Sequence, residues 1–253
     1  MKSIKFKAIV TYDGTCFFGW QSQAGNRTIQ SEIEHTLENI FGSPVKIKAS
    51  GRTDASVHGL RQVFSFSVKT EMSPIQVLRA MNSLLDRKIR IKQVSYAEED
   101  FHPRFCAEKK IYRYLICDFP SPFLINRAWY IGKELNLSRM RKAAISIVGT
   151  HDFTSFQASG RKAENPVRTI EYIKIKKEYF CIDPDIKIVL IEICGTGFLY
   201  KMVRNIVGTL VDVGIGKKQP CEIKNIIEAK NRNFASATAP GYALYLGNVM
   251  YSD

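Results

Sequence analysis

An acidic residue and an arginine stand two positions apart in one short loop, Ala49-Ser50-Gly51-Arg52-Thr53-Asp54-Ala55-Ser56-Val57-His58-Gly59. An arginine nearby favours the ionised form of a carboxylate, and an ionised aspartate can act as a nucleophile or a general base. In most loops such an aspartate only stabilises a turn, and Arg52 can be an ordinary surface charge. The pair Arg52 and Asp54 nevertheless suits a reaction on a negatively charged substrate.

Two tyrosines alternate with basic residues in the stretch Lys109-Lys110-Ile111-Tyr112-Arg113-Tyr114-Leu115. On a strand, Tyr112 and Tyr114 share one face and Arg113 points to the other. The tyrosines can stack on nucleic-acid bases while the lysines bind phosphates. Packing of both tyrosines in the core is an equally good interpretation.

A third candidate is Arg204, which lies inside the apolar stretch from Phe198 to Val213 that we expect to be one helix. An arginine among apolar residues is costly unless a partner takes its charge. Asp54 is a candidate partner, another acid is the alternative, and Arg204 can also share a narrow polar side with Lys201. A Gly-Thr-Gly sequence before this helix could hold phosphate, although such a motif alone is weak.

The hydrophobic patterning predicts the elements that must position these residues. Strands are expected at 5–12, 45–48, 63–68, 89–94, 110–117, 243–251 and in two runs between 170 and 194, and helices at 29–40, 74–85, 137–148, 198–213 and 223–230. A strand-helix-strand-strand-helix-strand order is ferredoxin-like. We therefore expect an α+β protein of two ferredoxin-like (RRM-like) halves, residues 1–105 and 106–253. They would share an extended, mostly antiparallel sheet with helices on one side and an active-site cleft between the halves.

Composition narrows the function classes. The 253 residues include 37 basic and 24 acidic side chains, a net charge of +13, which favours a polyanionic partner. Six cysteines without a C-x-x-C pair and four unclustered histidines argue against a zinc site or a disulfide framework. No segment approaches the roughly 20 apolar residues that a membrane span requires. We expect a soluble, cytoplasmic protein.

Several ordered motifs together resemble the tRNA pseudouridine synthase A family along nearly the whole chain. The matching pieces are Tyr12-Asp13-Gly14, Phe18-Gly19-Trp20-Gln21, Gly51-Arg52-Thr53-Asp54-Ala55, Asp100-Phe101-His102, Arg104-Phe105, Tyr112-Arg113-Tyr114, His151-Asp152-Phe153-Thr154-Ser155-Phe156, Met202-Val203-Arg204-Asn205-Ile206-Val207-Gly208 and Tyr245-Leu246. The sequence departs from the family at Ser56, where glycine is usual, and at Phe198-Leu199-Tyr200-Lys201, which replaces a histidine-rich stretch.

The resemblance implies a role for each candidate residue. Asp54 corresponds to the catalytic aspartate, and Tyr112 to the tyrosine that stacks on the target base. Arg204 matches the arginine that pairs with the aspartate, and Arg52 the arginine that enters the RNA and holds the nucleotide out of the stem. The family isomerises uridine to pseudouridine at about positions 38 to 40 of the tRNA anticodon stem-loop, without metal or cofactor. Its members are homodimers in which one tRNA contacts both subunits. The alternative is a non-catalytic, structured-RNA-binding protein on the same fold, which has no need of a carboxylate facing phosphates.

Overall fold

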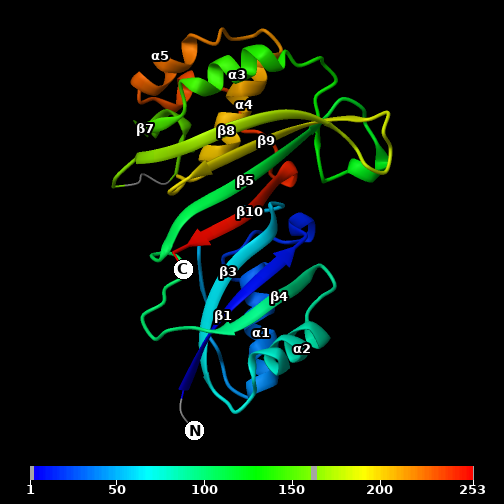
Figure 1. The fold of residues 1–253 in the computed structure, drawn as a ribbon, viewed down its shortest axis with the longest axis vertical. Helices are drawn as coiled ribbons and strands as arrows, with labels where there is room; N and C mark the ends of the chain where they lie inside the picture. Colours follow the sequence, from blue (N-terminus) through cyan, green and yellow to red (C-terminus); the bar gives the residue numbers. More distant parts are fainter. Residues whose placement is uncertain (1–2, 161–163, 253) are drawn as a thin grey trace. The chain divides into compact units, whose positions relative to one another are not determined.

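The computed structural model describes residues 3–160 and 164–252 (Figure 1). Its contacts group the chain into two compact units. Unit 1 comprises Met1–Glu108 and Tyr245–Asp253, and unit 2 comprises Lys109–Leu244. The last strand thus groups with the N-terminal residues, whereas the division between 105 and 106 placed it in the second half.

Unit 1 is a mixed sheet with two helices. Its strands are β1 (Ser3–Tyr12), β2 (Lys48–Ala49), β3 (His58–Lys69), β4 (Ile89–Tyr96) and β10 (Leu244–Tyr251), and its helices are α1 (Ile29–Phe41) and α2 (Pro74–Leu84). Antiparallel pairs join β4 to β1, β1 to β3 and β2 to β3, and β10 runs parallel to β3. Aromatic and aliphatic side chains from the sheet and both helices form its core.

Helix α1 follows directly from the sequence. Ile29, Ile33 and Leu37 form an apolar stripe and are fully buried, as their spacing predicts. The helix begins after Thr28, whose side chain accepts a hydrogen bond from the Ser31 backbone N–H. It ends at Gly42, which takes the left-handed conformation that commonly terminates helices.

Unit 2 comprises five strands and three α-helices within the described residues. Its strands are β5 (Ala107–Cys117), β6 (Trp129–Tyr130), β7 (Gly149–Asp152), β8 (Val167–Tyr179) and β9 (Lys187–Gly195), and its helices are α3 (Leu137–Ile145), α4 (Met202–Gly214) and α5 (Glu222–Glu228). Antiparallel pairs give the order β5-β9-β8-β7, and β6 runs parallel to β5. The predicted α+β class is confirmed.

Helix α4 begins four residues later than predicted. The expected start at Phe198 is wrong because Lys201 has a φ of 56°, a left-handed conformation that a continuing helix does not contain. The Met202 backbone N–H instead donates to the Leu199 carbonyl in a turn that precedes the helix. The N-terminus of α4 is therefore not formed by Gly195-Thr196-Gly197. A phosphate site that combines this sequence with the start of the helix is not present in the described part of the chain.

Candidate active site

The loop that carries Asp54, residues 50–57, connects β2 to β3 in unit 1. Asp54 is half-buried, and Arg52 is exposed to solvent. The start of the loop is fixed by the buried side chain of Gln62, which bonds to the Ser50 hydroxyl and donates to the Gly51 carbonyl at 2.8 Å. Since buried polar groups need such partners, this end of the loop has a defined conformation.

A second segment, residues 12–20, braces the middle of the loop. The Tyr12 and Thr53 side-chain oxygens lie 2.8 Å apart in a buried hydrogen bond. The Trp20 backbone N–H donates to the Thr53 carbonyl at 3.0 Å, and the Ser56 N–H donates to the Phe17 carbonyl at 3.3 Å. Hydrogen bonds therefore hold the residue before Asp54 and the residue two positions after it.

Two glycines allow this close approach of backbone to backbone. A Cβ on Gly14 would lie 2.1 Å from the Val57 carbonyl oxygen, and one on Gly19 would lie 2.6 Å from the Thr53 oxygen. Gly19 also has a φ of +87°, which side-chain-bearing residues rarely adopt. Beyond the expected strand that ends at Tyr12, the sequence patterning did not predict a structural role for segment 12–20. The available signal was the pair of glycines among aromatic residues just after a strand.

The far end of the loop leads into His58, whose side chain is buried. Its Nδ1 accepts a hydrogen bond from the Gly14 N–H at 3.2 Å and lies 3.3 Å from an Asp13 carboxylate oxygen. Its ring stacks on Tyr245 of β10, with centroids 4.6 Å apart. The loop is thus anchored at both ends as well as in the middle.

Ser56 is the strained residue of the loop. Its φ of 64° lies in the left-handed region, where a side chain costs about 1–2 kcal/mol. This is the position at which the sequence departs from the family's usual glycine. The braces from segment 12–20 act on this residue and hold it in the strained conformation.

In unit 2, the two tyrosines of β5 differ in burial, a difference that the sequence alone did not predict. Tyr114 is fully buried and donates to the Pro240 carbonyl at 2.9 Å, and burial raises the pKa of its phenol. Tyr112 is only half-buried, and its ring meets Phe198 edge to face at 5.1 Å. Core packing therefore accounts for Tyr114, while part of Tyr112 stays accessible.

Arg204 lies in the first turns of α4, a helix whose other residues are buried except Asp212. The Arg204 side chain is half-buried, and its Nε donates to the Ala239 carbonyl at 2.7 Å. This bond gives the arginine one fixed anchor inside unit 2.

The structure therefore places Arg52 and Asp54 in one braced loop of unit 1, and Tyr112 and Arg204 in unit 2. The meeting of Asp54 with Tyr112 and Arg204 in one cleft stays a prediction. Across residues 3–160 and 164–252, no group of three or more His, Cys, Asp or Glu side chains is placed to hold a metal ion. Over the same ranges, the helices are too short or too polar to cross a membrane.

A family model described as tRNA pseudouridine synthase matches residues 8–106 and 143–252. The tRNA pseudouridine synthase A of Exiguobacterium sp. is 42% identical over 250 residues, covering 98% of both chains. That of Bacillus subtilis is 40% identical over 254 residues, covering 99% of this chain and all of its own. Among solved structures, the archaeal box H/ACA sRNP Nop10–Cbf5 complex matches at 11% identity and a TM-score of 0.35, over 90% of this chain and 59% of that one.

The family model spans both units, and the relatives align almost end to end with this chain. The resemblance read from the sequence motifs is thereby confirmed. This chain belongs to the tRNA pseudouridine synthase family, whose enzymes isomerise uridine to pseudouridine in tRNA.

Proposed function

We propose that this protein isomerises uridines 38, 39 and 40 in the anticodon stem-loop of tRNA, with Asp54 as the catalytic residue. It acts in the cytoplasm as a homodimer and uses neither metal nor cofactor. Its two halves, residues 1–105 and 106–253, are ferredoxin-like and enclose the cleft. The net charge of +13 supports a polyanionic substrate, because basic side chains that neutralise phosphates supply much of the affinity for nucleic acids.

The reaction exchanges one bond of the base for another. The C1′–N1 glycosidic bond breaks, the uracil turns, and C5 bonds to C1′. The hydrogen on C5 is lost and N1 gains one, so the product is an isomer of the substrate. A paired and stacked base cannot turn, so the nucleotide must first leave the stem, at a cost of a few kcal/mol.

Each candidate residue has a place in this sequence of events. Arg52, exposed beside Asp54, enters the RNA and holds the target nucleotide out of the stem. Tyr112 offers the accessible part of its ring as a stacking surface for the uracil, since every base presents a flat π-face. Arg204 pairs with Asp54 and orients its carboxylate. Either a nucleophilic or a general-base role uses that carboxylate.

The observation that carries the proposal is the bracing of the Asp54 loop. A loop whose aspartate only stabilised a turn would not require two glycines and a buried Tyr12–Thr53 hydrogen bond to fix its middle. Catalytic groups, in contrast, must be held within about 0.5 Å of their working positions. In unit 1, hydrogen bonds to Thr53 and Ser56 restrain the backbone on both sides of the half-buried Asp54, which supports this role.

Tritium release from tRNA labelled at uridine C5 tests the proposal. The native protein should release the label in a single turnover, because the C5 hydrogen is lost when C5 bonds to C1′. Asp54→Ala should release none and should bind tRNA with nearly native affinity. Asp185→Ala, in the exposed hairpin between β8 and β9, is the matched control and should behave as native.

The same assay decides between the enzyme and the non-catalytic binder. A native protein that binds tRNA and releases no tritium is a binder, and the catalytic proposal is then wrong. Release by Asp54→Ala at the native rate would show that the protein is an enzyme and that Asp54 is not its catalytic residue.

A further inference from the structure

Residues 235–240 of unit 2 lie along helix α4 and are bonded to it at both ends. The Ser236 N–H donates to the Thr209 hydroxyl at 3.2 Å. The Ala239 N–H donates to the Arg204 carbonyl, also at 3.2 Å. The segment therefore follows the helix for more than one turn and reaches it again at Arg204.

Gly208 lets the segment approach the helix closely. A Cβ on this residue would lie 2.0 Å from the Ala237 carbonyl oxygen, so no larger residue fits without moving the segment. A glycine inside a helix destabilises it by about 0.5–1 kcal/mol relative to alanine. The close contact with residues 235–240 gives this glycine a structural reason.

The side chain of Asn205 joins the segment to the helix. This side chain is fully buried, and its Oδ1 accepts from the Thr238 hydroxyl at 2.6 Å and from Arg232 Nη2 at 3.1 Å. Its Nδ2 donates to the Phe156 carbonyl at 2.7 Å. Buried amides are costly unless they are hydrogen-bonded in this way, so Asn205 fixes Thr238 in one position.

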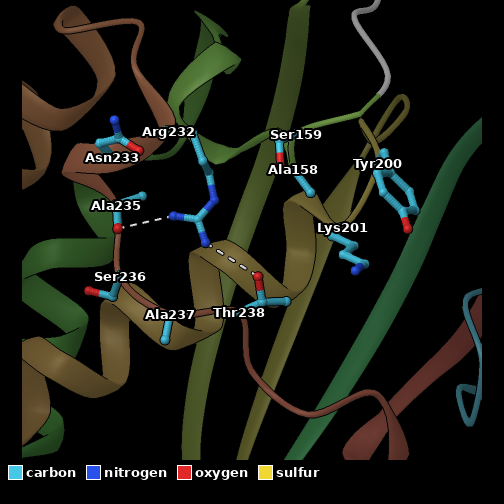
Figure 2. A pocket seen from close by; sticks show the side chains of 10 residues that line it. All are labelled: Ala158, Ser159, Tyr200, Lys201, Arg232, Asn233, Ala235, Ser236, Ala237 and Thr238. Carbon is cyan, nitrogen blue, oxygen red and sulfur yellow. Dashed lines mark hydrogen bonds between the residues drawn. The ribbon is translucent and has the colours of Figure 1, made fainter.

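Arg232 completes the network from the other side of the segment. Its Nη1 donates to the Ala235 carbonyl at 3.0 Å, and its Nη2 reaches the Thr238 hydroxyl at 3.3 Å (Figure 2). Burial lowers the pKa of this guanidinium, so its placement has a desolvation cost. A cavity of about 490 Å³ adjoins the network, and Lys201 and Tyr200 also line it. The guanidinium points toward Ala235 and Thr238 (Figure 2).

The network ends at Arg204. The residue after Thr238 is Ala239, whose carbonyl accepts from Arg204 Nε at 2.7 Å. The next carbonyl, of Pro240, accepts from the buried Tyr114 phenol at 2.9 Å. Moving Thr238 would therefore move the acceptor that holds the Arg204 side chain.

We propose that Asn205, Arg232 and Thr238 are positioning residues that fix the guanidinium of Arg204 through the Ala239 carbonyl. The inference rests on the proposed function, in which Arg204 orients the catalytic carboxylate. It assigns to these three residues an effect on the reaction rate that passes through Arg204. A small displacement of Arg204 is enough, because a misplacement of about 1 Å can slow a reaction by about 100-fold.

Thr238→Val is the main test, since it removes the hydroxyl and keeps the shape of the side chain. We expect kcat for tritium release to fall by about 10- to 100-fold, with KM and the Kd for tRNA unchanged. Thr238→Ser, which restores the hydroxyl, should recover most of the rate. Thr150→Val is the matched control, because it breaks an exposed hydroxyl pair with Thr169 and should keep the native kcat.

A second variant covers the case in which Thr238→Val does not fold. Arg232→Lys keeps the charge and cannot donate to two acceptors in the fixed geometry of a guanidinium. It should therefore also lower kcat at constant KM. Thermal unfolding shows which variants are folded. A native kcat in folded Thr238→Val or in folded Arg232→Lys overturns the proposal.

A double-mutant cycle with Arg204→Lys tests whether the effect passes through Arg204. Residues that act through one another have non-additive effects, so Thr238→Val should slow Arg204→Lys little further in single-turnover release. Full additivity overturns the positioning role. An inactive native protein would instead show that the proposed function itself is wrong, which separates the two failures.

Discussion

The Tyr12 phenol bonds to the Thr53 hydroxyl, 2.8 Å away, at the residue directly before Asp54. Tyr12 belongs to the first strand, so a side chain fixed in the sheet holds the residue next to Asp54. Both residues are buried, and water does not compete for this bond.

Tyr12→Phe removes this bond and leaves the ring in the core. We expect a loss of about 1 kcal/mol in the free energy of unfolding, together with a lower kcat at unchanged tRNA affinity. Urea unfolding and tritium release measure the two effects. Tyr96→Phe is the matched control, since Tyr96 is exposed in the same unit and its ring, which stacks on Phe6, is kept. A native kcat in folded Tyr12→Phe would show that the loop does not need this brace.

Ser56→Gly should stabilise the protein by less than about 1 kcal/mol. Glycine avoids the left-handed strain of about 1–2 kcal/mol but loses more chain entropy on folding. Ser56→Ala keeps the strain and should bring no gain. Chemical denaturation compares the two variants, and equal midpoints would show that the loop does not store this strain.

Tyr112→Ala should slow turnover by about 5- to 150-fold while the protein stays folded. Base–aromatic stacking is worth about 1–3 kcal/mol, whereas the lost edge contact with Phe198 is worth about 0.5–1.5 kcal/mol. Tyr114→Ala, on the same face of β5, should mainly destabilise the protein, because that ring is fully buried. Turnover by Tyr112→Ala at the native rate would show that the Tyr112 ring serves only in packing.

Arg52→Ala should slow the reaction more on a stem uridine than on an unpaired one. The paired substrate must lose stacking and pairing before reaction, and the unpaired one has already lost them. Single-turnover release from two tRNAs that differ only in the partner of the target uridine measures the ratio. Equal slowing on both substrates argues against a flipping role.

Glu192 makes part of the stability of unit 2 dependent on pH. Burial alone would raise the pKa of its carboxyl, but hydrogen bonds from Arg113 at 2.8 Å and Tyr172 at 3.0 Å outweigh it and lower the pKa. A lowered folded pKa stabilises the protein above the unfolded value of about 4.3, and this stability is lost as the pH falls through the folded pKa.

Glu192→Gln should therefore lower stability at pH 7 by less than about 1 kcal/mol, since Arg113 is partly exposed. The variant should also lose less stability than the native protein between pH 7 and pH 3 in thermal melts. Glu178→Gln, at the exposed end of β8, is the control and should match the native pH profile. Parallel profiles for native and Glu192→Gln would contradict the assignment.

Local patterns predicted the elements, and long-range contacts decided the details. The stripe of Ile29, Ile33 and Leu37 predicts α1 because its period is that of a helix. The start of α4 could not be predicted in the same way. The apolar pattern of the helix extends back to Phe198 and Leu199, so it does not mark the boundary. The helix is interrupted by the left-handed conformation of Lys201.

The candidate site shows the same division. Asp54 and Arg204 could be found from motifs, because their residue types are unusual in their surroundings. The brace from Tyr12 to Thr53 and the bond from Arg204 to Ala239 each join positions more than 30 residues apart. Neither periodicity nor spacing contains that information.

The placement of β10 has a consequence for synthesis of the protein on the ribosome. His58 and Tyr245 are neighbours in a parallel pair, although all of unit 2 lies between them in the chain. Domains generally fold in the order in which they emerge, and an unpaired strand edge invites association with other chains. In the nascent chain, one edge of β3 therefore lacks its partner β10 until unit 2 has been translated. The loop that carries Asp54 therefore gains the stacking contact of His58 with Tyr245 only after unit 2 has been translated.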